Sequence, residues 1–112
     1  MIKIEGKTVI LNGNIFTFQN TVLDAVSIEQ KLLVVFQPDN ADNSKNNLYC
    51  YDLNKKMIWR IQEPSTDIAG TVRFPYIGLC VQAAQQAVVD FYGRRFTFNI
   101  ESGEITGKDI VR

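Results

Sequence analysis

The chain has 112 residues, of which 46% are hydrophobic and 21% are charged, and its twelve basic side chains balance twelve acidic ones. These values fit one globular domain over residues 1–112 and exclude a disordered or fibrous chain. The balanced charge excludes a general attraction to nucleic acid or to an anionic membrane surface.

Apolar residues alternate with polar ones along most of the chain, and no stretch has the apolar spacing of a helix. In the first half this pattern predicts strands at Thr8–Leu11, Ile15–Phe18, Val22–Ile28 and Leu32–Gln37. Asn12 and Gly13 tolerate positive φ, so they predict a tight hairpin turn between the first two strands. The polar run from Pro38 to Asn47 predicts a long surface loop.

The second half of the chain shows the same alternation of apolar and polar residues. It predicts strands at Leu48–Leu53, Met57–Gln62, Ile77–Gln82, Ala87–Tyr92, Arg95–Ile100 and Glu104–Val111, with turns that include Gln85 and Gln86. Residues 66–76 are ambiguous, and Ala83–Val88 has room for one helical turn. Ten segments thus have strand character, and we expect an all-β fold of about eight or nine short strands, either an antiparallel sandwich or an open, blade-like stack.

A weak repeat links the predicted hairpins. Val9, Gly13 and Phe16–Phe18 match Val89, Gly93 and Phe96–Phe98 at a constant offset, and Tyr49–Leu53 aligns with Phe96–Ile100. In the middle unit Asp52 and Trp59 stand at the spacing of the Asp and Trp that end successive blade strands in propellers. This spacing resembles the blades of β-propellers of the quinoprotein or WD type. A propeller needs at least about four blades of roughly 40 residues, so the resemblance implies an open stack of blades.

The sequence offers little for catalysis. Without histidine it lacks the usual general base and the commonest zinc ligand. Cys50 and Cys80 form no CxxC pair, and Asp39 with Asp42 does not complete a calcium-binding loop. We therefore expect no enzymatic activity, no cofactor and no metal site.

Several side chains are expected in the core. Trp59, Phe96 and Phe98 are predicted to be buried, since alternation places Arg95 and Thr97 on the opposite face of their strand. Tyr49 and Tyr51 share one face of a strand and Cys50 with Asp52 the other, and burial of the tyrosine pair is preferred. The N-terminus lacks a signal peptide and the chain lacks a long apolar span, so we expect a cytoplasmic protein with reduced cysteines.

The lack of recognisable catalytic and metal-binding residues favours a binding function. A local acidic surface supplies the candidate partner-binding residues Asp39, Asp42, Glu63 and Asp67, and Asp24 and Glu29 add further negative charge. In size, composition and lack of catalytic residues the chain resembles small bacterial immunity proteins. That resemblance implies a toxin as partner, often a basic nuclease domain, which is neutralised by steric and electrostatic blockade. No membrane partner is expected.

Two alternatives remain. Lys55, Lys56, Arg94 and Arg95 are candidate residues of a nucleic-acid-binding β module, because basic and aromatic residues interleave from Phe91 to Phe98. The third hypothesis is a structural, propeller-like subunit of a larger assembly.

Overall fold

The computed structural model describes residues 1–38, 45–70, 74–82 and 85–110, and the chain there is almost entirely β. The N-terminal sheet contains β1 (Ile2–Glu5), β2 (Thr8–Leu11) and β3 (Asn14–Thr17). The central sheet contains β4 (Val22–Ile28), β5 (Lys31–Phe36), β6 (Leu48–Asp52) and β7 (Met57–Arg60). The C-terminal sheet contains β8 (Tyr76–Gln82), β9 (Gln85–Asp90), β10 (Arg94–Phe98) and β11 (Ile105–Ile110), and the short helix α1 (Thr66–Ala69) precedes it.

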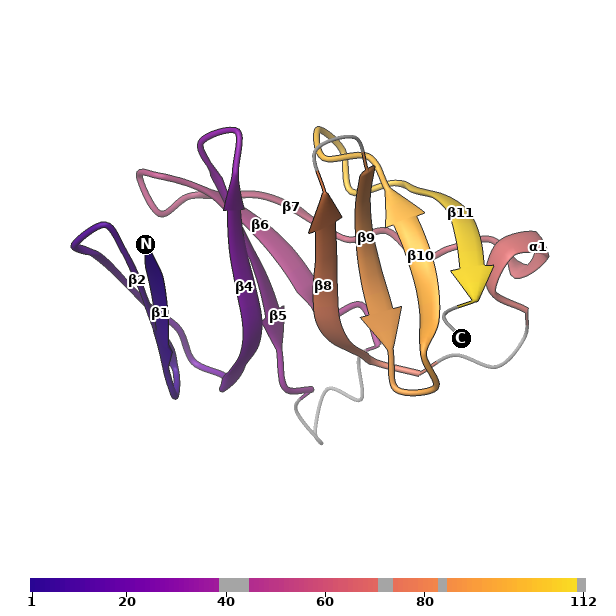
Figure 1. The fold of residues 1–112 in the computed structure, drawn as a ribbon, viewed down its shortest axis with the longest axis horizontal. Helices are drawn as coiled ribbons and strands as arrows, with labels where there is room; N and C mark the ends of the chain where they lie inside the picture. Colours follow the sequence, from indigo (N-terminus) through magenta and orange to yellow (C-terminus); the bar gives the residue numbers. More distant parts are fainter. Residues whose placement is uncertain (39–44, 71–73, 83–84, 111–112) are drawn as a thin grey trace.

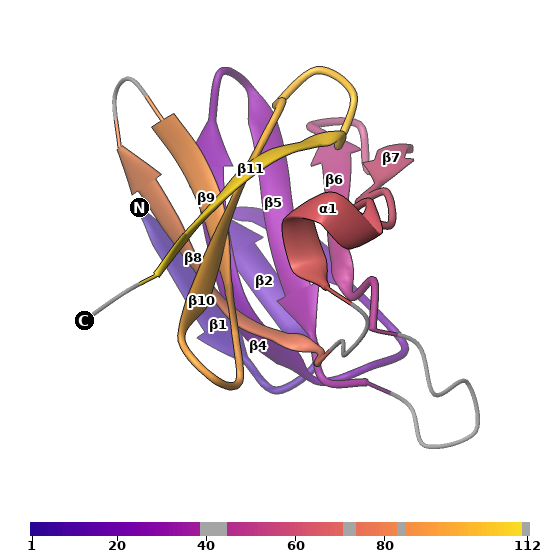
Figure 2. The ribbon, with the colours of Figure 1, turned by 90° about the vertical axis from the view of Figure 1, so that its right-hand side faces the viewer.

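The three sheets form a stack of blades. Each sheet is antiparallel and follows the order of its strands in the sequence, and the first strands β1, β4 and β8 contact one another in succession. The sheets follow one another along the long axis of the molecule (Figure 1). Seen from the C-terminal end, β8–β11 lie in front of the central sheet and α1 lies beside them (Figure 2). The predicted all-β, blade-like stack is confirmed, with eleven strands in the described residues instead of eight or nine.

The central sheet is covered on both faces, and this explains the continuous apolar run of β5. Leu32 and Val34 belong to the core beside the N-terminal sheet, whereas Leu33 and Val35 belong to the core beside the C-terminal sheet. The expectation that only one face of β6 would be buried was therefore wrong. Cys50 is fully buried toward the C-terminal sheet, and Tyr49 and Tyr51 are partly buried toward the N-terminal one.

The repeat seen in the sequence corresponds to equivalent strands. Its aligned segments lie in β3, β6 and β10, each of which is the third strand of its sheet. Asn12 and Gly13 have φ of 49° and 85°, which confirms the tight β2–β3 turn.

Two further turns share one capping arrangement. The Asp52 carboxylate accepts hydrogen bonds from the backbone N–H groups of Asn54 and Lys56. The Asp90 carboxylate accepts them in the same way from Tyr92 and Arg94. The residue after the midpoint of each turn, Lys55 or Gly93, has a positive φ.

Other local expectations were corrected or confirmed. The sequence did not predict β1. Gln85 and Gln86 belong to β9 instead of a turn. Of the possible helical turn at Ala83–Val88, residues 83–84 lie outside the described residues and residues 85–88 are strand. The ambiguous region contains α1. Trp59, Phe96 and Phe98 are buried, as predicted. Cys50 and Cys80 are both free.

Within the described ranges the one helix has four residues, so no helix there could cross a membrane.

Candidate functional site

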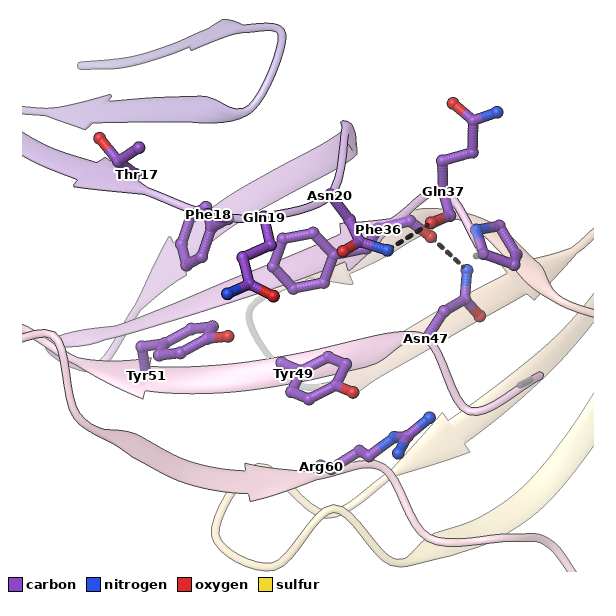
Figure 3. Close-up of a pocket in the computed structure, with 11 residues that line it drawn as sticks. Thr17, Phe18, Gln19, Asn20, Phe36, Gln37, Asn47, Tyr49, Tyr51 and Arg60 are labelled. Atoms are coloured by element: carbon purple, nitrogen blue, oxygen red, sulfur yellow. Dashed lines mark hydrogen bonds between the residues drawn. The ribbon is translucent and has the colours of Figure 1, made fainter. Parts of the chain in front are cut away.

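The site with the most distinctive geometry is a groove beside β3. The central and C-terminal sheets each have a fourth strand, β7 and β11, whereas β3 is the last strand of the N-terminal sheet. An open groove of about 410 Å³ lies between the chain at Thr17–Asn20 and the face of β6 and β7. Figure 3 shows Tyr49, Tyr51 and Arg60 facing Phe18 and Gln19 across it. We call it the aromatic groove.

Four aromatic rings form a continuous surface in this groove. The Phe18 ring lies 5.0 Å from Phe36 and 5.1 Å from Tyr51, measured between centroids. The Tyr49 ring lies 5.3 Å from Phe36 and 6.4 Å from Tyr51. Alternation along β6 brings both tyrosines to the face that the N-terminal sheet covers incompletely. The result is an aromatic surface on which Phe18, Tyr49 and Tyr51 keep part of their area accessible, whereas Phe36 is buried beneath them.

Polar groups hold the rim in place. The Asn47 side-chain amide donates to the carbonyl oxygens of Phe36 (2.7 Å) and Tyr76 (2.8 Å), and its oxygen accepts from the Tyr76 N–H (2.9 Å). This buried residue therefore ties the groove wall to the start of β8. Arg60 donates from Nε to the Asn46 carbonyl oxygen (2.8 Å), and its guanidinium lies 5.1 Å from the Tyr49 ring centroid.

The electrostatics of the groove favour a neutral phenol and a positive rim. Burial, with a smaller contribution from Tyr49, raises the pKa of Tyr51 to about 12, so the hydroxyl stays protonated at neutral pH and can donate a hydrogen bond. Among the described residues that line the groove, Arg60 is charged and none is a carboxylate. A neighbouring pocket of about 250 Å³ shares Gln19, Asn20, Gln37 and Pro38 with the groove and adds Lys7.

The acidic residues predicted from the sequence do not line this groove. Asp39 and Asp42 lie outside the described residues. Glu63 lies after β7 and Asp67 lies in the first turn of α1, both exposed. Asp24 is not part of an acidic surface, because its partly buried carboxylate accepts hydrogen bonds from the backbone N–H groups of Ala25 and Leu79 (both 2.9 Å).

The basic residues of the nucleic-acid alternative are separated. Lys55 and Lys56 lie in the β6–β7 turn, whereas Arg94 and Arg95 begin β10 near the opposite end of the sheets (Figure 1). Arg94 also pairs with the fully buried Asp90 carboxylate (Nε–Oδ2 2.7 Å). The structure therefore does not bring these four cations together into one basic surface.

Sequence reasoning missed most of the groove. It considered Tyr49 and Tyr51 as surface or core residues, but it gave no role to Phe18, Phe36 or Arg60. The available signal was the pair of tyrosines at alternate positions. Their face is accessible because β3 is the last strand of its sheet in the described part of the chain, which is a property of strand pairing.

Comparison with solved structures supports the blade-like fold. The chain is similar to BamB from Moraxella catarrhalis, a β-propeller, with a TM-score of 0.65 and 11% sequence identity. The match covers 98% of this chain and 32% of the BamB chain, so the chain spans about one third of that protein's length. The computationally designed Ika8 protein matches with a TM-score of 0.36 and 8% identity over 96% of this chain and 48% of its own.

No curated protein matches the sequence significantly. A family model, in contrast, matches residues 1–110. The chain therefore belongs to the family described as "Domain of unknown function (DUF7957)".

Proposed function

We propose that this protein is a non-enzymatic binding module whose partner is another protein, held in the aromatic groove. The observation that carries the proposal is the partly accessible surface of Phe18, Tyr49 and Tyr51, packed on the buried Phe36 ring, where the described residues add no fourth strand to the N-terminal sheet. The proposal keeps the binding function predicted from the sequence but assigns it to the aromatic groove instead of the acidic residues.

The composition of the groove supports a protein partner. Tyrosine and arginine are enriched among the residues that contribute most to protein interfaces, because they offer a large apolar area with polar groups at its edge. Tyr49, Tyr51 and Arg60 bring both features into one groove. The Asn47 hydrogen bonds hold the groove wall in one conformation before binding, and this limits the entropy lost on association.

The test compares two pairs of accessible aromatic side chains. Purified wild type, a Tyr49→Ala/Tyr51→Ala variant and a Phe91→Ala/Tyr92→Ala control are immobilised, and proteins retained from host extract are quantified by mass spectrometry. Phe91 and Tyr92 are 68% and 67% exposed and lie outside the groove, so they control for non-specific aromatic adhesion.

We expect a protein that wild type and the control retain and the groove variant loses. Its purified form should then bind wild type at least about tenfold more tightly than the groove variant, as loss of interface anchors predicts. Circular dichroism and thermal unfolding verify that each variant is folded. A partner with equal affinity for all three proteins would contradict the assignment of the groove.

A narrower form of the proposal makes the partner a basic bacterial toxin domain that this protein neutralises in the cytoplasm. It is supported by the exposed position of Glu63 and Asp67 and by the general resemblance to immunity proteins. Reversing these two residues and Asp39 and Asp42 to lysine should slow association with a toxin domain encoded by a neighbouring gene. The defect should shrink as salt rises, because rim charges act mainly on the association rate. Stopped-flow rates that ignore both changes would contradict this narrower form alone.

A further inference from the structure

The free edge of β3 carries backbone groups that can pair with a further strand. Phe18 donates from its N–H to the Lys7 carbonyl oxygen (2.9 Å), so this residue pair is hydrogen-bonded. Antiparallel ladders alternate, so Phe16 and Asn14 also direct their backbone groups toward β2. Ile15 and Thr17, between them, direct their N–H and C=O groups away from β2 at the edge of the sheet.

The other two sheets show what occupies the equivalent position. In the central sheet β7 pairs with the third strand β6, and in the C-terminal sheet β11 pairs with the third strand β10. The corresponding place in the N-terminal sheet lies next to β3, where Thr17 and Phe18 line the aromatic groove. A strand placed there would extend the β3 ladder and lie above Tyr49 and Tyr51.

Resting on the proposed function, we propose that the partner inserts an extended segment that pairs with β3 as the fourth strand of the N-terminal sheet. β3 has four residues, so a segment of about four to six residues would suffice. Alternate side chains of the segment face the tyrosines, and the others face away. Backbone pairing of this kind is an established way for a sheet edge to bind a peptide.

The charges of the groove define the chemistry of the segment. Arg60 stands on the β7 side, Lys7 lines the adjoining pocket, and the described residues that line the two pockets include no carboxylate. Arginine pairs strongly with carboxylates, so the segment carries at least one aspartate or glutamate directed toward Arg60. The inserted segment, as distinct from the partner's net charge, is therefore acidic and has apolar residues at alternate positions.

The probe is a library of random decapeptides displayed on phage, selected on the whole protein and counter-selected on the Tyr49→Ala/Tyr51→Ala variant. We expect enrichment of peptides with apolar residues at alternate positions and a carboxylate between or beside them. Arg60→Gln should weaken the best acidic peptide by about tenfold, and should leave its glutamine-substituted analogue nearly unaffected.

Two measurements test the backbone pairing. Methylation of the peptide backbone at successive amides should weaken binding by about fivefold or more at every second position, since each lost hydrogen bond contributes about that factor. Thr17→Pro removes the outward N–H of β3 while leaving the β2 ladder intact, and should have a similar effect. Thr17→Ala is the matched control, because it removes the same side chain and keeps the N–H.

The outcomes separate this inference from the proposed function. Peptides that need the tyrosines but tolerate every methylation would overturn the strand pairing and leave the groove as the binding site. If the selection enriches no peptide but a folded partner is retained through the tyrosines, the strand pairing is overturned and the groove remains the binding site. Failure of both the selection and the retention experiment would overturn both. A wild-type dimer that Thr17→Pro converts to a monomer would show that a second copy occupies the edge, against the proposed partner.

Discussion

The central sheet meets its two neighbours in different ways. Toward the C-terminal sheet, Trp59 is 8% exposed, packs edge-on against Phe98 at 5.8 Å and donates from Nε1 to the Ile100 carbonyl oxygen at 2.8 Å. Toward the N-terminal sheet, Tyr49 and Tyr51 remain partly accessible in the aromatic groove. The C-terminal sheet has a fourth strand and the N-terminal sheet does not. The same kind of side chain therefore stabilises the fold on one face and is available for binding on the other.

The largest expected contrast is between aromatic deletions on the two faces. Trp59→Ala should lower the free energy of unfolding by about 4 kcal/mol, because it removes a buried indole and leaves a cavity. Tyr49→Ala should cost about 1 kcal/mol, since much of its ring borders an open groove. Urea denaturation measures both values. Equal losses would mean that the groove is as tightly packed as the closed interface.

Gly103 tests how closely the connection between β10 and β11 approaches Trp59. A Cβ added to Gly103 would lie 2.5 Å from Trp59 Cε3, and the residue has a φ of +75°. Gly103→Ala should therefore cost about 3 kcal/mol from overpacking and backbone strain together. Gly93→Ala is the control, because its φ is +81° but nothing lies within 4 Å of the added Cβ. It should cost about 1 kcal/mol, and a similar loss for both variants would show that the contact with Trp59 is unimportant.

Alkaline titration compares one ionisable group on each face. Burial raises the pKa of Cys50 from 9.0 to about 11 and that of Tyr51 from 10.0 to about 12. Both folded-state values lie above the unfolded ones, so the stability linked to Tyr51 is fully present below pH 10 and is lost as pH rises through 12. Tyr51→Phe should make the loss of unfolding free energy between these two pH values less steep. An unchanged slope would show that the phenol is well solvated.

The smallest effect concerns the β6–β7 turn, which contacts the N-terminal sheet through a hydrogen bond from the Asn14 side chain to the Leu53 carbonyl oxygen. Lys55 has a φ of 71° in this turn, where Gly93 occupies the matching place in the β9–β10 turn. Lys55→Gly should raise the unfolding free energy by about 0.5 kcal/mol by relieving this conformation. A clear destabilisation would instead show that the Lys55 ammonium, 5.8 Å from the Phe16 ring centroid, contributes more than the strain costs.

Local patterns predicted every strand except β1, but not how the sheets are stacked. Alternation identified Val22–Ile28 with its observed bounds, and Asn12-Gly13 identified its turn. The apolar run at Leu32–Phe36 was recognised as a strand, yet its burial on both faces became evident only when a sheet was found on each side. β1 was missed although Ile2 and Ile4 alternate with charged residues.

The candidate site was harder to predict for two reasons. It depends on the directions in which side chains point, and on β3 being the last described strand of its sheet. Asp24 appeared to belong to an acidic surface, but the strand register shifts between Val22 and Asp24, and its carboxylate accepts a hydrogen bond from the Leu79 N–H. Tyr49 and Tyr51 were recognised as a pair sharing one face. Their accessibility follows from the position of β3 at the edge of the N-terminal sheet, and this position cannot be predicted from the residues of β6.

The order of the sheets also determines how cooperatively the molecule unfolds. The sheets are built from consecutive strands, and the central sheet is the neighbour through which the N-terminal sheet is held. A stack with mainly nearest-neighbour contacts behaves as a one-dimensional array, in which a terminal unit can open while the rest stays folded. Native-state hydrogen exchange should therefore find β2 and β3 less protected than β5. A strand bound along β3 would oppose local opening of the N-terminal sheet and so slow hydrogen exchange in β2 and β3. Binding at this edge could therefore be measured through the exchange rates of those amides.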